Sequence, residues 1–502
     1  MAQRRTGGAA PPGRAGAVGA VEAEGYAPVP PQGGPVASAP VVPATPPATT
    51  PAPPRRTALA EGLDRLRHGA GTEPGRLRLI GAGLALLLLA FGAASAWQVS
   101  GRAAAAHDVL HVSEPQVNTS ALIYGELAAA DTAATTEFLS TGEARTDARE
   151  RYTNSVAAVS ENLAGAAADK TAGSTHAVER INRQLPLYTA QIDTARVYNR
   201  SGVPLGGAWL RQASGVMQDT TLVQATRLRE AESEQLASDY AAATPYPWIA
   251  IVLGVLVLAA LGGAQYRDYR RTHRILNRGL VAAATAALAL LAWIVAGHGV
   301  ARADLRDSRK SGVASVTALT DARIAALQAR ANENLSMVNR GAVLDKNGDD
   351  LYEAHFQQRF GQLAGTDGDG RGELLLRAEK LIVSDTGREA LDGAVAELKQ
   401  WSARHTNVRD KADASEYAEA ARLVVGGEDP RAKENNTSTD AAFQKVDDAL
   451  GKAIAAERAD FIEAARSGVD AFSGLAIGGG ALAVLGAFGA LMGVGRRLSE
   501  YR

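Results

Sequence analysis

The stretch RDYRRTHRILNR, residues 267–278, carries five arginines and a single acid. It lies between two uncharged runs, WIAIVLGVLVLAALGGAQ (248–265) and GLVAAATAALALLAWIVAG (279–297). Each run is about long enough to cross the ~30 Å hydrocarbon core of a bilayer as an α-helix. A short, strongly basic loop between two spans belongs on the cytoplasmic side. The stretch therefore predicts two membrane helices and sets the direction of the rest of the chain.

Two further runs without charged side chains, 79–98 and 471–495, predict the first and the fourth span. Basic residues outnumber acidic ones in every segment that this topology places inside. Acidic residues outnumber basic ones in the two segments that it places outside. This asymmetry follows the positive-inside rule. We therefore expect a multi-pass membrane protein with both termini in the cytoplasm. The high Ala, Gly and Arg content, with almost no Lys in the first half, suggests a GC-rich bacterial genome, and hence a bacterial plasma membrane.

The predicted organisation has ten segments. The tail at 1–56 holds most of the 20 prolines and few large apolar residues, so we expect it to be disordered. In chain order the segments are the Pro/Ala-rich tail (1–56), a basic juxtamembrane segment (57–78), the first span (79–98), an outside helical bundle (99–247), the second span (248–265), the basic loop (266–278), the third span (279–298), a second outside bundle (299–470), the fourth span (471–495) and a short tail (496–502).

Both outside segments show helical periodicity. Apolar or small residues recur three and four positions apart from Val313 to Val338, and a fainter stripe runs from Ile123 to Phe138. Four antiparallel helices with such stripes are most simply buried as an up-down bundle. The expected fold is an all-α membrane protein with two outside four-helix bundles in a duplicated span-bundle-span arrangement. Helix breaks are predicted at 140–147, 170–175, 200–207, 341–350, 365–372, 386–387 and 426–430.

The bundle helices next to the membrane are expected to continue into the spans without interruption. The stripes are expected to face the core of their own bundle. In the fourth span, Gly474/Gly478 and Gly489/Gly493 have the small-xxx-small spacing that lets membrane helices approach closely. A homodimer that pairs through this span is one use of that spacing.

No pattern of an enzyme appears. The chain has no cysteine, its eight histidines are scattered, and nucleophile, phosphate-binding and zinc motifs are absent. Asp367 and Asp369 resemble the start of a calcium loop, but Ala378 stands where a bidentate Glu is required, and DKNGDD (345–350) fails the same comparison. The spans hold no Asp, Glu, Lys or Arg, which argues against conduction. We expect no catalysis, no cofactor, no metal and no nucleic acid.

The stretch QLPLYTAQIDTARVYNRSGVPLGGAWLRQASGVM (184–217) resembles the third and fourth helices of the four-helix-bundle sensor domains of bacterial chemoreceptors. With the four-pass layout, residues 55–502 resemble the GlnX family of actinobacterial membrane proteins. That resemblance implies a signalling protein that links a glutamine-binding lipoprotein outside to a soluble Ser/Thr kinase, protein kinase G, inside. It carries over no catalytic residues.

Partner contacts are expected at the membrane-distal turns and at the inner face. The distal turns are 140–147, 200–207, 341–350 and 426–431. The candidate outside contacts are Leu205, Trp209, Arg200, Asp345, Asp349 and Asp429. The candidate inside contacts are Arg267, Arg270, Arg271, Arg274, Arg278, Arg496 and Arg497.

Two alternatives stay open at this stage. In the first, the protein senses a small ligand directly, and Arg196 and Arg200 receive its carboxylate between bundle helices. In the second, it is a membrane scaffold or a transport accessory without a signalling role.

Overall fold

The computed structural model describes residues 73–168, 172–272, 277–365, 370–426 and 437–499. They belong to one compact unit, Arg65–Arg502. The other unit, Met1–Asp64, lies outside the described residues, and so does the predicted disordered tail. Within the described ranges every regular element is a helix, and the one β-type pairing is an isolated bridge between Leu344 and Asp350. The all-α prediction is confirmed.

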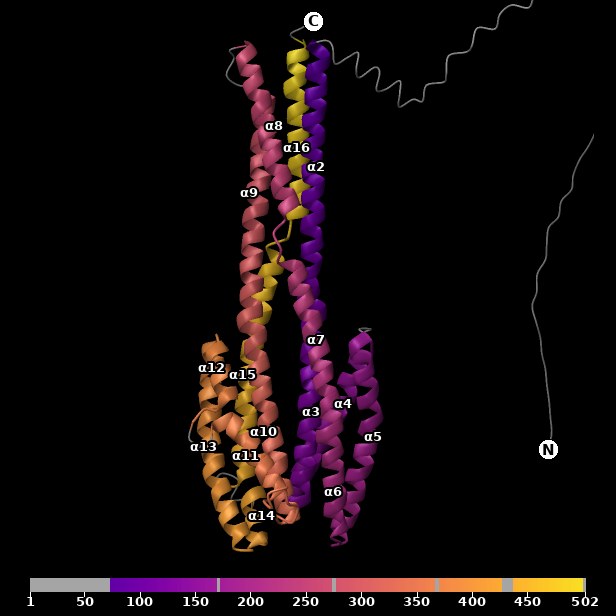
Figure 1. Cartoon of the computed structure of the whole chain (residues 1–502), viewed down its shortest axis with the longest axis vertical. Coiled ribbons are helices and arrows are strands. Elements are labelled where there is room, and N and C mark those ends of the chain that lie inside the picture. The colour runs from indigo at the N-terminus through magenta and orange to yellow at the C-terminus, as the bar shows by residue number, and fades with distance from the viewer. Residues whose placement is uncertain (1–72, 169–171, 273–276, 366–369, 427–436, 500–502) are drawn as a thin grey trace, which may run out of the picture. The chain divides into compact units, whose positions relative to one another are not determined.

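Four helices carry the predicted spans and pack on one another at one end of this unit (Figure 1). Each is long and apolar enough to cross a membrane. Side chains such as Leu86 and Ile477 stay exposed on their outer faces, as expected of groups that contact lipid. The chain is therefore an all-α, multi-pass membrane protein. The helices are α2 (Glu73–Asp108), α8 (Trp248–Thr272), α9 (Arg278–Asp307) and α16 (Leu475–Ser499).

Glycines bring α9 and α16 into close contact. A Cβ atom on Gly279 would lie 2.4 Å from the Cα atom of Gly493 and 2.6 Å from the carbonyl oxygen of Gly489. A Cβ on Gly478 would lie 2.4 Å from the ring of Trp293. The small-residue spacing of the fourth span therefore serves a contact within the chain.

The first bundle consists of four helical rods. The helix breaks at 140–141 and 201–204 fall inside the predicted ranges. The third break separates Ala168 from Ala172, and the residues between them lie outside the described ones. The elements are α3 (Glu114–Leu139), α4 (Gly142–Ala168), α5 (Ala172–Arg200), and α6 (Leu205–Val216) with η2 (Met217–Thr221) and α7 (Leu222–Ala243).

The second bundle is more interrupted than predicted. A break expected at 386–387 lies at 382–384 instead, because Ser384 caps the next helix by accepting a hydrogen bond from the Gly387 amide at 2.7 Å. A further break at 414–416, with Ser415 at a φ of 62°, was not predicted. The elements are α10 (Ala314–Asn339), α11 (Leu351–Ala364), α12 (Glu373–Leu381), α13 (Asp385–Asp413), α14 (Tyr417–Val425) and α15 (Thr439–Asp470).

The first helix of each half runs from the span to the bundle tip without a break. In both halves it passes through a short π-helical segment, which is η1 (Val109–Ser113) between α2 and α3, and η3 (Ser308–Val313) between α9 and α10. Such segments insert extra backbone into an α-helix and often occur at functional sites. The two halves therefore share both the continuous helix and the position of its irregularity.

The last helix of each half does not continue into its span, which corrects the prediction. Helix α7 ends at Ala243 and α8 starts at Trp248, because Pro245 and Pro247 lack amide donors and disfavour helix in the residues before them. Arg102 binds this connection by donating to the Pro245 carbonyl at 2.7 Å. Between α15 and α16 the chain turns at Gly474, whose φ is 73°, a conformation that glycine adopts without strain.

One apolar core extends through both bundles, because α3 and α10 pack against each other (Figure 1). The predicted stripe on α10 contributes to this shared core, beyond the core of its own bundle. Val316, Ile324 and Leu327 of that stripe face α3 and α7 of the first bundle. Helix α10 is buried on several faces, since the other helices of the second bundle cover its remaining sides.

Candidate functional site

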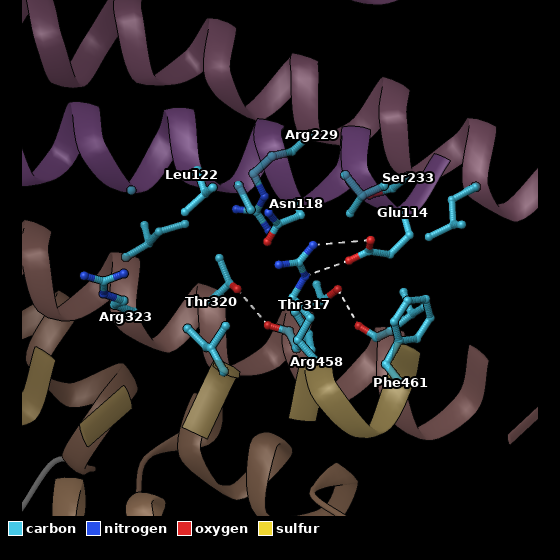
Figure 2. Close-up of a pocket in the computed structure, with 18 of the residues that line it drawn as sticks. Glu114, Asn118, Leu122, Arg229, Ser233, Thr317, Thr320, Arg323, Arg458 and Phe461 are labelled. Carbon is cyan, nitrogen blue, oxygen red and sulfur yellow. Dashed lines mark hydrogen bonds and ion pairs between the residues drawn. The ribbon is translucent and has the colours of Figure 1, made fainter. Parts of the chain in front are cut away.

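A cleft lies between the two bundles, bounded by α3 and α7 on one side and by η3, α10 and α15 on the other (Figure 2). Its cavity volume is about 100 Å³, and it opens to solvent at its mouth. Small-molecule sites in proteins typically have volumes of about 300–1,000 Å³ and mostly apolar walls. The cleft is smaller than that range, so it suits only a small ligand, and both halves of the chain contribute to it.

The walls of the cleft are mainly apolar. Aliphatic side chains come from all four long helices around it, and Phe461 closes the end near η3 (Figure 2). Burial of apolar surface is worth roughly 25 cal/mol per Å², so these walls favour a ligand with an apolar part. The apolar lining residues are Val117, Ala121, Leu122, Leu236, Val313, Val316, Ile324, Leu327, Ile454 and Phe461.

An ion pair crosses the cleft near its middle. Arg458 of α15 donates through Nε to Glu114 of α3 at 2.8 Å (Figure 2). Asn118 and Thr317 lie beside this pair, and the Thr317 hydroxyl donates to the Val313 carbonyl of its own helix at 2.7 Å. The pair joins the start of α3 to the second bundle.

Beyond that pair, the cleft presents charges of both signs. Arg229 of α7 binds Asp321 of α10 at 2.6 Å, and Arg323 binds Asp447 of α15 at 2.7 Å. The two arginines line the cleft, and their aspartate partners are not among its lining residues. Glu126 of α3 also lines the cleft, and it makes no hydrogen bond or ion pair with any residue that the structure describes.

Polar contacts fix the packing of α3 on α10. Thr132 donates to the Leu327 carbonyl at 2.9 Å, and the buried amide of Asn334 donates to Thr136 at 2.9 Å. Gln328 donates to the Tyr124 hydroxyl at 3.1 Å. Because buried polar groups strongly prefer to be hydrogen-bonded, these contacts favour one register between the two halves.

A buried ionic network fills the second bundle. Arg330 and Glu333 have no exposed surface and pair at 2.6 Å, and Arg330 also binds Asp440 at 3.0 Å. His405 lies between Glu333, at 2.7 Å, and Glu353, at 3.0 Å. Burial alone would lower the pKa of His405, but its hydrogen bonds to the two carboxylates raise it to about 9. The imidazole is therefore a cation near neutral pH, held between two anions.

Another buried carboxylate, that of Asp131 in the first bundle, is held by uncharged donors. Asp131 accepts hydrogen bonds from Ser214 at 2.7 Å, Tyr188 at 3.2 Å and Gln218 at 3.3 Å. Burial raises the pKa of the Asp131 carboxyl, and the three hydrogen bonds oppose that rise. Its donors come from α5, α6 and η2, so it ties three elements to α3.

Of the predicted outside contacts that the structure describes, three lie at or near the turn between α5 and α6, and two lie in the loop that follows α10. Leu205 is 46% exposed at the turn between α5 and α6, and Arg200 is exposed at the end of α5. Trp209 is half-buried and packs against the core. Asp345 organises its own loop by accepting hydrogen bonds from the Asn347 and Asp349 amides at 2.8 and 3.0 Å. Of the remaining two, Asp349 is exposed and Asp429 lies outside the described residues.

The loop of Asp345 is an ordinary turn, because backbone amides occupy its carboxylate. The other calcium candidates, Asp367 and Asp369, fall outside the described residues. Within the described ranges no group of three or more His, Cys, Asp or Glu side chains is arranged to hold a metal.

Arg196 is occupied by the chain itself. Its guanidinium binds Glu137 through Nε at 2.9 Å and Nη2 at 2.6 Å, and it lies over the ring of Tyr152. Arg149 binds the same carboxylate at 2.6 Å. A ligand carboxylate at Arg196 would have to displace Glu137, which makes the open cleft between the bundles the better candidate.

The predicted inside contacts lie at the span end of the unit, where α8 and α16 end and α9 begins (Figure 1). Arg270 and Arg278 are exposed, and Arg267 is half-exposed. Arg496 is exposed near the end of α16. The side chains of Arg271, Arg274 and Arg497 are outside the described part of the chain.

Sequence reasoning missed the cleft and the ionic network. The cleft needs side chains from four helices that are distant in the chain, and its charged residues have the pattern of surface residues. The network had one local signal, since Arg330 and Glu333 interrupt a run of small and apolar residues on α10 three positions apart.

Comparison with known protein families gave one match. Residues 105–241, which include the whole of α3 to α6 and nearly all of α7, match the family described as the actinobacterial sensor domain. Comparisons with curated proteins and with solved structures gave no match. The match to a sensor domain, together with four helices of membrane-spanning length, fits a membrane sensor.

Proposed function

We propose that this protein is a transmembrane sensor and adaptor, which receives a solute-binding lipoprotein on its outer bundles and passes the signal to a soluble Ser/Thr protein kinase in the cytoplasm. The observation that carries this proposal is the continuity of α2 with α3 and of α9 with α10. A change in how α3 packs on α10 shifts two helices that run on through the membrane. No separate hinge is needed between the sensing end and the span end.

The outer partner is proposed to bind at the distal turns. Val203 and Leu205 are exposed apolar side chains beside Arg200 at the turn between α5 and α6. An exposed apolar pair with a charged neighbour suits a protein contact. The family match to a sensor domain covers this turn.

The inner partner is proposed to bind the basic residues at the span end. The exposed guanidinium groups of Arg270, Arg278 and Arg496 lie on three different helices at that end. A shift of α9 or α16 therefore changes their spacing. The partners, an amino-acid signal and the GlnX-like role come from the resemblance noted above.

The topology is tested with single cysteines, because the native chain has none. Ser201→Cys on the distal turn and Arg270→Cys at the span end are labelled in intact cells with a membrane-impermeant maleimide. We expect Ser201→Cys to react and Arg270→Cys to react only after the cells are opened. The reverse pattern would invert the proposed direction of signalling.

The partners are tested by purifying the full-length protein from its native membrane in mild detergent and identifying bound proteins by mass spectrometry. We expect a solute-binding lipoprotein and a soluble kinase. The double variant Val203→Asp/Leu205→Asp should lose the lipoprotein and keep the kinase. Leu187→Asp is the matched control, because Leu187 is exposed in the middle of α5, away from the turn. Equal capture by both variants would reject the distal turn as the contact.

A second candidate function, direct sensing of a small ligand, is favoured by one observation, which is the cleft between the bundles. In that case the cleft replaces or supplements the lipoprotein as the receiver of the signal. The non-signalling scaffold is not supported by any feature described above.

A further inference from the structure

We propose that the cleft between the bundles binds a free α-amino acid with an uncharged, apolar side chain. Glu126 faces the ammonium group, Arg229 and Arg323 face the carboxylate, and the apolar wall receives the side chain. The signalling consequence rests on the proposed sensor function, whereas the binding itself does not.

The arginines have donors left for a ligand. Asp321 engages only Nη2 of Arg229, and Asp447 engages Nε and Nη2 of Arg323. The other guanidinium N–H groups of these two residues make no hydrogen bond within the described part of the chain, and both side chains line the cleft. Guanidinium groups bind carboxylates through paired N–H donors. Their aspartate partners hold the two groups in place.

Glu126 supplies the opposite charge. It is half-buried, lines the cleft and makes no hydrogen bond or ion pair with a described residue. The hydrogen-bonded Asp447 and the charge of Glu126 both raise the pKa of Arg323, so Glu126 lies within electrostatic reach of that guanidinium. A ligand ammonium group at Glu126 would complete the pairing.

Charge complementarity then selects the ligand class. A simple carboxylate would place a second anion beside Glu126, and a simple amine would face Arg229 and Arg323. A zwitterion with adjacent ammonium and carboxylate groups avoids both repulsions. The apolar residues Leu122, Val316 and Ile324 line the cleft with these charges, so an apolar side chain completes the match.

The position of the cleft connects occupancy to the membrane helices. Gly312 and Val313 of η3 line it, and Glu114, which also lines it, directly follows η1. A ligand there contacts α3, α7 and α10 together. Binding favours whichever arrangement of the bundles offers all three contacts, and therefore biases the two continuous helices.

The test uses the purified full-length protein in lipid nanodiscs and isothermal titration calorimetry. The probes are L-leucine, 4-methylpentanoate, which lacks its ammonium group, and 3-methylbutylamine, which lacks its carboxylate. We expect L-leucine to bind at least 10-fold more tightly than either analogue. Absence of L-leucine binding, or equal binding of one single-charge analogue, would overturn the proposal.

Two variants place the binding in the cleft. Glu126→Gln keeps the size of the side chain and should weaken L-leucine binding at least 10-fold. Ala121→Trp fills the cleft and should abolish binding. Glu161→Gln is the matched control, because Glu161 is exposed on α4 and should leave the affinity unchanged. Thermal unfolding of each variant shows whether it is folded, and unchanged affinity in both cleft variants would reject the site.

The outcome is separable from that of the proposed function, because calorimetry needs no partner protein. If L-leucine does not bind but the lipoprotein is still captured, the cleft proposal is rejected and the adaptor function stands. If L-leucine binds but no partner protein is captured, the proposed partners are rejected and the cleft proposal stands.

Discussion

The phenolic oxygen of Tyr240 lies 2.8 Å from the hydroxyl oxygen of Ser308. Tyr240 belongs to the last turn of α7, and Ser308 is the first residue of η3. The neighbouring Asp239 accepts a hydrogen bond from Ser113, the last residue of η1. One turn of α7 therefore contacts the π-helical segments of both continuous helices, just before the chain enters α8.

Tyr240→Phe is expected to destabilise the protein by about 1 kcal/mol, because it removes a buried hydrogen bond and leaves the Ser308 hydroxyl without its partner. Ser308→Ala should have a similar effect. The double variant should be little worse than either single one, because both substitutions remove the same interaction. Unfolding of all four proteins in one detergent checks this, and strictly additive losses would show that the two hydroxyls are not coupled.

The stability of the second bundle should fall as the pH rises from about 6.5 to about 9. The folded protein holds the proton of His405 more tightly than the unfolded chain does, because Glu333 and Glu353 raise its pKa from 6.5 to about 9 against the effect of burial. The stabilisation is complete below the unfolded pKa and is lost through this window, by about 3 kcal/mol at most.

Unfolding midpoints measured between pH 6 and pH 9.5 check this dependence. His405→Gln should be less stable than the wild type at pH 6 and approach it at pH 9.5. His355→Gln is the control, because His355 is exposed on α11 and should keep the wild-type slope. A parallel slope in His405→Gln would assign the dependence to other groups.

Glu333→Gln is expected to destabilise the protein by about 3–5 kcal/mol, because it leaves the buried cations Arg330 and His405 without their shared anion. The substitution conserves volume, so lost packing does not explain such an effect. The free energy of unfolding at pH 7 is the measurement. Glu389→Gln, at an exposed position on α13, should change it by less than about 0.5 kcal/mol. A loss equally small in Glu333→Gln would contradict the network.

Gly279→Ala is expected to separate α9 from α16, because its methyl group would overlap the backbone of Gly493. Overpacking of this kind typically destabilises by about 1–3 kcal/mol. Thermal unfolding in nanodiscs should show a lower midpoint. Gly262→Ala on α8 is the matched control, since no atom lies within 4 Å of its added Cβ. Equal midpoints for the two variants would show that the glycine contact does not limit stability.

The spans and the helical fold were predictable because their signals are local. The absence of charge over the apolar part of α8 depends on consecutive residues, and so do the turns marked by Gly202 and Pro204. The break before α8 had a local signal too, in Pro245 and Pro247, but the periodic pattern on both sides concealed it. The break at 414–416 carries neither glycine nor proline.

The cleft and the ionic network were not predictable because their members meet only through tertiary packing. Glu126 and Arg229 are more than 100 residues apart and look like solvent-facing charges on amphipathic helices. His405 finds its carboxylates on α10 and α11, at distances along the chain that no helical period relates. Which face of α10 the first bundle covers is a property of the whole fold.

Helices α3 and α10 hold the same place in the two halves and pack on each other inside one polypeptide. Linkage of this kind gives the two halves a high effective concentration that dilution does not lower, so their association is unimolecular. The halves also have separate codons, which frees each to evolve on its own. The two halves can therefore differ at their contact. The ion pair of Glu114 with Arg458 is an example, because one half carries the acid and the other carries the base.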